Sequence, residues 1–123
     1  MTSQKYNPKV SVIMNCFNGE KYLYKSISSV IGQSYKNWEL IFWDNNSTDN
    51  SKKIFDKFND KRMKYYRSNK YIKLYKARNE AIKNCTGTLI AFLDIDDWWD
   101  EKYLSNKEEF LKNSHYDYFY SNT

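Results

Sequence analysis

Two hydrophobic patterns alternate along this 123-residue chain, and that alternation constrains the fold more than any other feature of the sequence. Short apolar runs typical of buried strands are followed by segments whose apolar residues recur at helical spacing. Strands are expected at residues 10–14, 38–43, 63–66, 89–93 and 116–120. Such alternation predicts parallel strands joined by crossover helices that cover both sheet faces. We therefore expect one α/β domain over residues 1–123, a three-layer, Rossmann-like arrangement with a mostly parallel sheet.

The helices are expected at residues 20 to about 33 and around three groups of apolar residues: Ile54, Phe55 and Phe58; Leu74, Ala77, Ala81 and Ile82; and Tyr103, Leu104, Phe110 and Leu111. Gly87 is predicted to close the third helix in the left-handed conformation that glycine tolerates best. The chain stops directly after its last expected strand, which leaves little material for the second wall of a cleft. The sequence therefore suggests a truncated domain.

Composition limits the partners and the compartment. The formal net charge is +5, but the lysines are dispersed along the sequence, so we expect no nucleic-acid partner. Cys16 and Cys85 match no metal-ligand spacing; they form either an oxidised pair or, as we favour, two buried thiols in a reducing compartment. Residues 1–9 lack the apolar stretch of a signal peptide, and no run reaches membrane-spanning length. A cytoplasmic protein is expected.

Polar side chains follow three of the expected strands, at the point where each strand ends. They are Asn15, Phe17 and Asn18 after the first strand, Asp44 and Asn45 after the second, and Asp94, Asp96 and Asp97 after the fourth. Open parallel sheets bind ligands beyond the carboxyl ends of their strands. The sequence therefore predicts a binding site along one edge of the sheet.

The acidic cluster after the fourth strand is the sharpest of these signals. Three carboxylates within four residues repel one another unless a cation or hydrogen-bond donors compensate them. A hard divalent ion such as Mg²⁺ or Mn²⁺ suits all-oxygen ligands and a diphosphate partner. The alternative is that these residues cap a helix that begins near Asp100. Capping does not explain Asp94, which directly ends an apolar strand.

The other candidate residues each have two interpretations. Asn45 offers both an acceptor and a donor for the edge of a pyrimidine base, although a plain loop also explains segment 44–45. Phe17 either packs beside such a base or belongs to the core. Arg78 is either a bidentate ligand for a diphosphate or an ordinary surface residue. Trp98 and Trp99 either form a platform for a sugar ring or pack against the following helix.

Three stretches, by their order and spacing, resemble the inverting glycosyltransferases of family 2, which have the GT-A fold. VSVIMNCFNGEKYLYKSISSVIGQSYKNWELIFWDNNSTDNS resembles the family's first strand, helix and second acidic loop. KARNEAI and TGTLIAFLDIDDWW resemble the stretch that ends in its Asp-x-Asp metal motif. The resemblance runs from Val10 to about Asn122. It implies metal-dependent transfer of a sugar from a nucleoside diphosphate donor to an acceptor, with inversion.

The resemblance also implies roles for individual residues. Asn15, Phe17 and Asn45 would contact the base, with Asn18 and Asp44 in the same nucleotide site. Asp94 or Asp96 would contact the ribose, Asp96 and Asp97 would hold Mn²⁺ or Mg²⁺, and Arg78 would lie near the phosphates. A UDP- or dTDP-type donor is favoured. The catalytic general base is expected beyond Thr123, and the acceptor is a saccharide or a lipid-linked molecule, which leaves peripheral association with the inner membrane face open.

This sequence departs from the family pattern at two places. Asn15-Cys16-Phe17 stands where Pro-Thr-Tyr is common, and Asn45 stands where a second Asp is frequent, which leaves the preferred base open. A nucleotide-binding module without catalysis of its own and a nucleotidyltransferase remain alternatives. The latter needs a Gly-rich phosphate loop, and only Gly19 follows the first strand. A dinucleotide oxidoreductase is disfavoured because no G-x-G-x-x-G occurs. A homodimer is left open.

Overall fold

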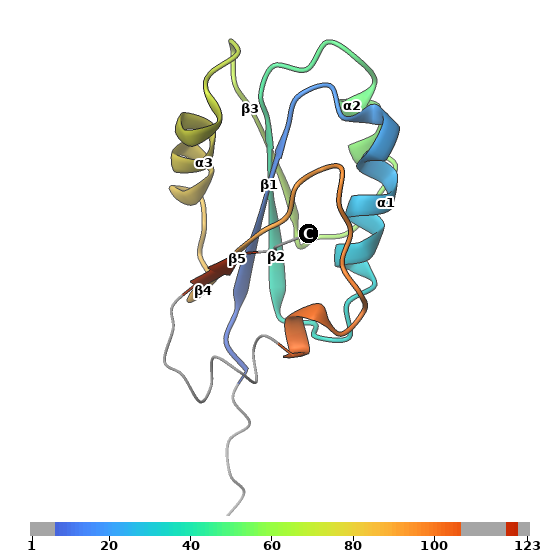
Figure 1. The fold of residues 1–123 in the computed structure, drawn as a ribbon, viewed down its shortest axis with the longest axis vertical. Helices are drawn as coiled ribbons and strands as arrows, with labels where there is room; N and C mark the ends of the chain where they lie inside the picture. Colours follow the sequence, from blue (N-terminus) through green and yellow to red (C-terminus); the bar gives the residue numbers. More distant parts are fainter. Residues whose placement is uncertain (1–6, 107–117, 121–123) are drawn as a thin grey trace, which may run out of the picture.

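The structure is a computed structural model that describes residues 7–106 and 118–120 (Figure 1). Its strands are β1 (Val10–Cys16), β2 (Trp38–Asp44), β3 (Met63–Arg67), β4 (Leu89–Phe92) and β5 (Tyr118–Tyr120). Its helices are α1 (Glu20–Ile31), α2 (Ser51–Phe55) and α3 (Leu74–Ile82). The five strands form one parallel sheet in the order β3-β2-β1-β4-β5. The predicted α/β class is confirmed.

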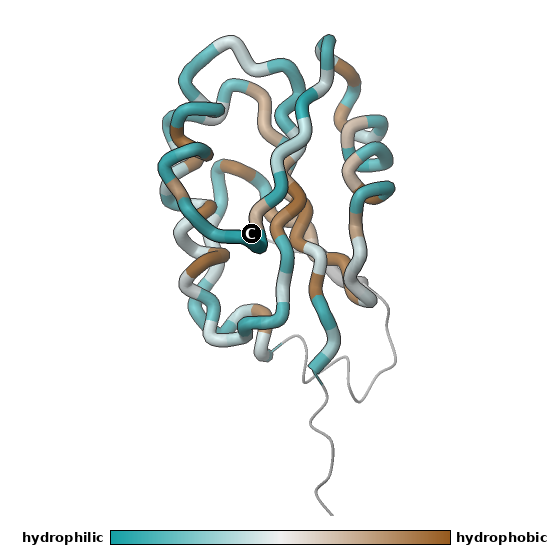
Figure 2. The backbone as a smooth tube through the Cα atoms, turned by 180° about the vertical axis from the view of Figure 1, so that it is seen from behind, coloured by the Kyte–Doolittle hydropathy of each residue, from teal (hydrophilic) through white to brown (hydrophobic). Residues whose placement is uncertain are grey.

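Helices cover both faces of this sheet. α1 and α2 lie on one side, and α3 lies on the other (Figure 1). Alternate residues of each strand face the two layers, so the α1 side receives Val12, Met14, Leu40 and Phe42, which are fully buried. The α3 side has a smaller core around Ile13, Ile41 and Ala81. The central strands are accordingly the most hydrophobic part of the chain (Figure 2).

The position of β1 decides where a site can form. β1 pairs with β2 on one side and with β4 on the other, in parallel register throughout. The chain runs from β1 to β2 and β3 in one direction and then crosses to β4, so the strand order reverses beside β1. At such a switch point the loops after neighbouring strands separate and leave room for a ligand. The loops after β1, β2 and β4 meet here.

Several elements end at different residues from those predicted. β1 continues to Cys16, α2 ends before Phe58, and α1 ends at Ile31. The buried side chain of Gln33, expected inside the first helix, instead links two segments. Its Nε2 donates to the Asp100 carbonyl at 2.6 Å, and its Oε1 accepts from the Leu104 amide at 2.9 Å. Tertiary hydrogen bonds thus replace the last turn of the helix.

The prediction that Gly87 closes the third helix in the left-handed conformation is wrong. α3 ends at Ile82, and no glycine of the described residues has a positive φ. Gly87 lies instead against the beginning of β1. A Cβ atom there would lie 2.6 Å from the carbonyl oxygen of Lys9 and 2.7 Å from Ser11 Oγ. Close approach between backbones, not dihedral freedom, therefore requires glycine at this position.

The amino ends of the strands are joined by one buried carboxylate. Glu39 on β2 accepts hydrogen bonds from Ser11 Oγ at 2.6 Å and from the Thr86 amide and hydroxyl at 2.6 and 2.9 Å. Lys64 Nζ lies 2.9 Å from Oε1, the oxygen that also accepts from the Thr86 hydroxyl. Burial by itself would raise the pKa of Glu39. The hydrogen-bond donors lower it by a larger amount, so the pKa is about 2. Glu39 therefore links β1, β2, β3 and the segment before β4.

Some predictions concern the end of the chain. Residues 103–106 are helical, whereas Phe110 and Leu111 lie outside the described residues. Cys16 is buried, Cys85 is half-buried, and both thiols are free, so the oxidised-pair alternative is not realised. None of the described helices has the length and apolar character that crossing a bilayer requires.

Candidate functional site

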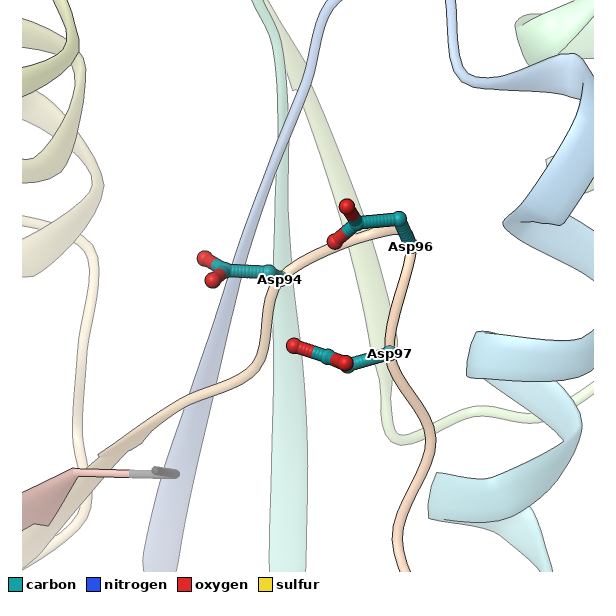
Figure 3. Close-up of side chains that lie close together, drawn as sticks. All are labelled: Asp94, Asp96 and Asp97. Carbon is teal, nitrogen blue, oxygen red and sulfur yellow. The ribbon is translucent and has the colours of Figure 1, made fainter. Parts of the chain in front are cut away.

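Asp94, Asp96 and Asp97 gather in the loop that follows β4. Each offers a carboxylate oxygen within 4.8 Å of the others, with Asp94 and Asp96 exposed and Asp97 half-buried. The carboxylates of Asp96 and Asp97 point from one limb of the loop toward Asp94 (Figure 3). A turn bond from the Asp97 amide to the Asp94 carbonyl, 3.0 Å long, fixes this bend. The three carboxylates of the predicted acidic cluster therefore lie close together, and their role as metal ligands stays a prediction.

Apolar residues between the acids fasten this loop to the fold. Leu93 is buried and its amide donates to the Ile13 carbonyl of β1 at 3.0 Å. Ile95 packs on Gly19, where a Cβ atom would lie 2.3 Å from Ile95 Cδ1. Because apolar and acidic residues alternate over 93–96, Leu93 and Ile95 turn inward and Asp94 and Asp96 turn outward. The pattern of the sequence thus creates the site.

The donor set fits a hard divalent cation. Three carboxylates supply only oxygen ligands, which hard divalent cations prefer, and a bound cation is one way to offset their repulsion. A different residue, Asp100, is available for the alternative role of capping the following helical turn. Asp100 accepts a hydrogen bond from the Lys102 amide through its carboxylate and from the Tyr103 amide through its carbonyl, at 3.1 and 3.0 Å.

Arg78 lies on α3 beside this cluster. Its Nη2 is 3.8 Å from Asp94 Oδ1, and its guanidinium lies 5.4 Å from the centre of the Phe92 ring. Ala77 and Ala81 of the same helix are fully buried, and their small side chains let α3 approach the sheet closely. Arg78 therefore faces the acidic loop, and its role as a diphosphate ligand stays a prediction.

Asn15 near the end of β1 carries an unsatisfied acceptor. Its Oδ1 is buried and accepts no hydrogen bond from the part of the chain that the structure describes. An unpartnered buried acceptor costs about 1–3 kcal/mol, so such atoms call for a partner. A ligand that brings an N–H or O–H group to this edge would supply one.

Phe17 and Tyr71 form an exposed aromatic pair. Their ring centres are 4.8 Å apart, at an interplanar angle of 71°. Phe17 is 46% exposed, so the core role considered for it does not apply. Tyr71 was missed by sequence reasoning because it lies in a segment without a predicted helix or strand, and no periodic signal marks it.

Asn18 joins the loops after β1 and β2. It has a positive φ of 51°, a conformation that Asn adopts more readily than most residues. Its Oδ1 accepts from the amides of Thr48 and Asp49 at 2.7 and 3.3 Å, and its own amide donates to Ser47 Oγ at 2.9 Å. The side chain thus braces the rim of the site.

Asp44 is fully buried at the end of β2. Its Oδ1 accepts from the Ser47 amide at 2.8 Å, and its Oδ2 accepts from Arg67 Nη1 at 2.9 Å and from the Tyr65 hydroxyl. Burial, followed by the bond to Asp44, raises the pKa of Tyr65 to about 12. Asp44 therefore holds Arg67 and the loop in place, and its contact with a nucleotide stays a prediction.

Asn45 is paired with the backbone of a distant segment. Its Nδ2 donates to the Ile72 carbonyl at 2.7 Å, and its Oδ1 accepts from the Ile72 amide at 3.1 Å. This reciprocal pair fixes the orientation of the amide and ties the segment that carries Tyr71 to β2. The Oδ1 atom retains a second lone pair for a further donor.

The two tryptophans behave differently. Trp99 is buried and stacks on Tyr103 with ring centres 4.4 Å apart, so it packs against the following helical turn. Trp98 is exposed, and Lys25 Nζ lies 3.4 Å from its ring centre. Trp99 is therefore excluded as a platform for a sugar ring.

The sheet topology and the polar loops at its carboxyl edge define an α/β domain of the kind that binds ligands at a switch point. The family described as "Glycosyl transferase family 2" matches residues 11–123. The chain therefore belongs to glycosyl transferase family 2, as its resemblance predicted. Membership in this family argues against the nucleotidyltransferase alternative.

Two relatives from Escherichia coli are similar over most of the chain. Both are named UDP-Glc:alpha-D-GlcNAc-diphosphoundecaprenol beta-1,3-glucosyltransferase. WfgD is 40% identical over 114 residues and WfaP is 36% identical over 113 residues. Each alignment covers 92% of this chain and 45% of the relative. The chain thus spans less than half the length of these proteins.

Solved structures share the fold. TarS of Staphylococcus aureus, residues 1–349 in complex with UDP, superposes with a TM-score of 0.80 at 28% identity, over 87% of this chain and 33% of that one. The mannosyltransferase PcManGT from Pyrobaculum calidifontis, in complex with GDP-Man and Mn²⁺, has a TM-score of 0.80 at 22% identity, over 86% of this chain and 33% of that one. The predicted GT-A fold is confirmed.

Proposed function

We propose that this chain is the nucleotide-sugar-binding part of a metal-dependent, inverting glycosyltransferase that uses a UDP- or dTDP-sugar. The observation that carries the proposal is the cluster of Asp94, Asp96 and Asp97 facing Arg78 at the switch point of the sheet. Opposite charges placed together at a solvent-exposed edge suit a metal–diphosphate pair. The relatives named as UDP-glucose-dependent enzymes and the UDP complex of TarS support the donor class.

The acidic loop and Arg78 serve the diphosphate. Asp96 and Asp97 hold Mn²⁺ or Mg²⁺, and Asp94 or Asp96 binds the ribose hydroxyls. When bound, such an ion neutralises the charge that develops on the leaving diphosphate. Arg78 contributes a planar guanidinium that binds phosphate oxygens bidentately. In the structure Arg78 is held beside Asp94, so the diphosphate and its cation would take the place of a weak internal ion pair.

The base lies over the ends of β1 and β2. The buried Oδ1 of Asn15 and the free lone pair of Asn45 Oδ1 are acceptors, and they suit the N3–H donor of uracil or thymine. Phe17 offers an exposed ring beside them. Asn18 and Asp44 complete this nucleotide site, chiefly by holding its loops in position.

The acceptor half of the reaction requires residues beyond Thr123. An inverting displacement needs a general base that removes the proton of the acceptor hydroxyl. We expect residues 1–123 alone to bind the donor and to transfer its sugar slowly or not at all. The acceptor is a saccharide or a lipid-linked molecule, and the protein acts in the cytoplasm; a lipid-linked acceptor would bring it to the inner face of the membrane. Rapid transfer from UDP-glucose by residues 1–123 would contradict this division.

A thermal-shift panel tests the donor assignment. The melting temperature is measured with UDP, dTDP, GDP and CDP, each with and without Mn²⁺, because a ligand stabilises the folded state according to its affinity. UDP or dTDP with Mn²⁺ should raise the melting temperature most, and Asp96→Ala with Asp97→Ala should remove the contribution of the metal. The control Asp56→Ala with Glu101→Ala removes two exposed carboxylates elsewhere and should retain it. A larger shift with GDP would contradict the base assignment.

A further inference from the structure

The net charge of the chain is concentrated in one short segment. Residues 67–83 contain six basic residues and one acidic residue, so their net charge equals the +5 of the whole chain. The basic residues are Arg67, Lys70, Lys73, Lys76, Arg78 and Lys83. Three of them are paired in the structure: Arg67 with Asp44, Arg78 with Asp94 and Lys83 with Glu80, at 2.9, 3.8 and 2.7 Å. The uncompensated positive charge of the segment is therefore carried mainly by Lys70, Lys73 and Lys76, and the rest of the sequence is neutral overall.

The same segment carries exposed apolar side chains. Tyr71, Leu74, Tyr75 and Ile82 are 58%, 52%, 59% and 38% exposed, and they make up half of the large exposed hydrophobic residues of the described chain. On α3, Leu74, Tyr75 and Ile82 line a shallow pocket together with Phe92 of β4. Exposed apolar residues that gather in this way mark an interaction site more often than scattered ones do.

α3 and the turn before it present a surface of exposed basic and apolar residues. We name it the α3 surface, and it consists of Lys70, Tyr71, Lys73, Leu74, Tyr75, Lys76, Ile82 and Lys83, all of which are exposed. Ala77 and Ala81 face the sheet, so the opposite side of the helix faces outward. α3 is the only described helix on its side of the sheet (Figure 1).

We propose that the α3 surface binds the anionic face of a phospholipid bilayer. Lysine side chains that flank apolar ones can extend their ammonium groups toward lipid phosphates while Tyr, Leu and Ile enter the headgroup region. Each lysine near an anionic bilayer contributes about 1 kcal/mol. Nucleic acid fits less well, because the aliphatic side chains of Leu74 and Ile82 have no matching partner on a phosphate backbone.

The inference rests on this surface alone and does not depend on the proposed function. It does have a consequence for the site, because Arg78 lies on the same helix and faces Asp94. A bilayer on the α3 surface would therefore lie beside the acidic loop. Such a position would suit an acceptor that is anchored in the bilayer.

Vesicle flotation tests the proposal. The protein is mixed with vesicles of phosphatidylcholine, or of phosphatidylcholine with one third phosphatidylglycerol, at low and at high salt. It should float with the anionic vesicles only, and less at high salt. The triple variant Lys70→Gln, Lys73→Gln, Lys76→Gln should bind about a hundredfold more weakly, the product of three such lysine contributions. Failure of the unaltered protein to float with anionic vesicles overturns the proposal.

The matched control removes three lysines from the other side of the sheet. Lys53, Lys57 and Lys61 are exposed and lie on α2 or in the segment that follows it. Their replacement by Gln changes the net charge by the same amount but should leave flotation within about twofold, because a surface-bound charge acts within a Debye length. Equal losses in the two triple variants would mean that only net charge matters, which contradicts a docking surface.

A second variant tests whether the α3 surface binds a membrane or another class of partner. Leu74→Gln with Ile82→Gln keeps the charge and the helix propensity, and should weaken flotation at least severalfold because the apolar contribution is lost. If this variant floats as well as the unaltered protein, or if an oligonucleotide displaces the protein from vesicles, a purely electrostatic surface is indicated and the proposal fails. Self-association through the α3 surface that competes with flotation would equally contradict it. Circular dichroism confirms that each variant is folded.

Discussion

At the scale of single residues, Glu39 has the clearest energetic role. It is 1% exposed and its oxygens accept four hydrogen bonds, two of them from Thr86. A buried carboxylate is tolerated only when donors replace its hydration. Here the donors do more than compensate, because the pKa falls from 4.5 to about 2. The group therefore makes the stability of the fold depend on pH.

The sign of that dependence follows from the lowered pKa. The contribution of Glu39 is complete above its unfolded pKa of about 4.5 and is lost as the pH falls toward 2. Its size is about 3 kcal/mol. In Glu39→Gln, the free energy of unfolding measured by urea denaturation should be lower at pH 7 and should depend less on pH below 4.5. Glu101→Gln, an exposed control, should keep the slope of the unaltered protein; an unchanged acid slope in Glu39→Gln would contradict the account.

Asn45 offers a second test at this scale. In Asn45→Asp the donor to the Ile72 carbonyl is lost and a carboxylate faces a carbonyl oxygen, so we expect a loss of about 1–3 kcal/mol in the free energy of unfolding. Asn46→Asp is the matched control. Asn46 accepts from Arg67 through Oδ1, has a φ of 65° and should tolerate a carboxylate within about 0.5 kcal/mol. Equal effects of the two substitutions on tryptophan-monitored unfolding would refute the pairing role.

At the scale of elements, the sequence pattern predicted which elements form but not where each one ends. Apolar runs such as 38–43 have few alternatives to a buried strand, so the β2 prediction was accurate. The first helix was predicted two residues too long because Gln33 bonds to Asp100 and Leu104, which no local pattern reveals. Gly87 was misinterpreted for the same reason, because its neighbour in space is the backbone of Lys9, far away in sequence.

Gly87 gives a prediction at the level of strand packing. A methyl group in Gly87→Ala would meet the backbone of Lys9 and Ser11 at less than 3 Å, so β1 and the segment before β4 must separate. We expect a loss of about 1–3 kcal/mol, measured as a lower urea midpoint. Gly32→Ala is the control, since its φ of −79° suits alanine and a Cβ there would meet only Ser28 O, at 3.2 Å. A urea midpoint of Gly87→Ala within error of that of Gly32→Ala would show that a methyl group fits between β1 and the segment before β4.

At the scale of the whole molecule, topology explains how much of the site could be predicted. The rule that ligands bind at the carboxyl edge of a parallel sheet predicts that Asn15, Asn45 and Asp94 lie at the same edge. The rule does not predict which residues from irregular segments contact the site. Tyr71, the pairing of Asn45 with Ile72 and the α3 surface all depend on how segment 68–73 folds back over β2. Sequence periodicity carries no information about that segment.

The central claim is that the loop after β4 binds a divalent cation together with the diphosphate of a nucleotide. The most direct measurement is the electron paramagnetic resonance signal of free Mn²⁺, titrated with the protein in the presence and absence of UDP. The signal should fall on binding, more steeply with UDP, and Asp94→Asn with Asp96→Asn and Asp97→Asn should weaken Mn²⁺ binding at least tenfold in a folded protein. Undiminished Mn²⁺ binding by that triple variant would contradict the account.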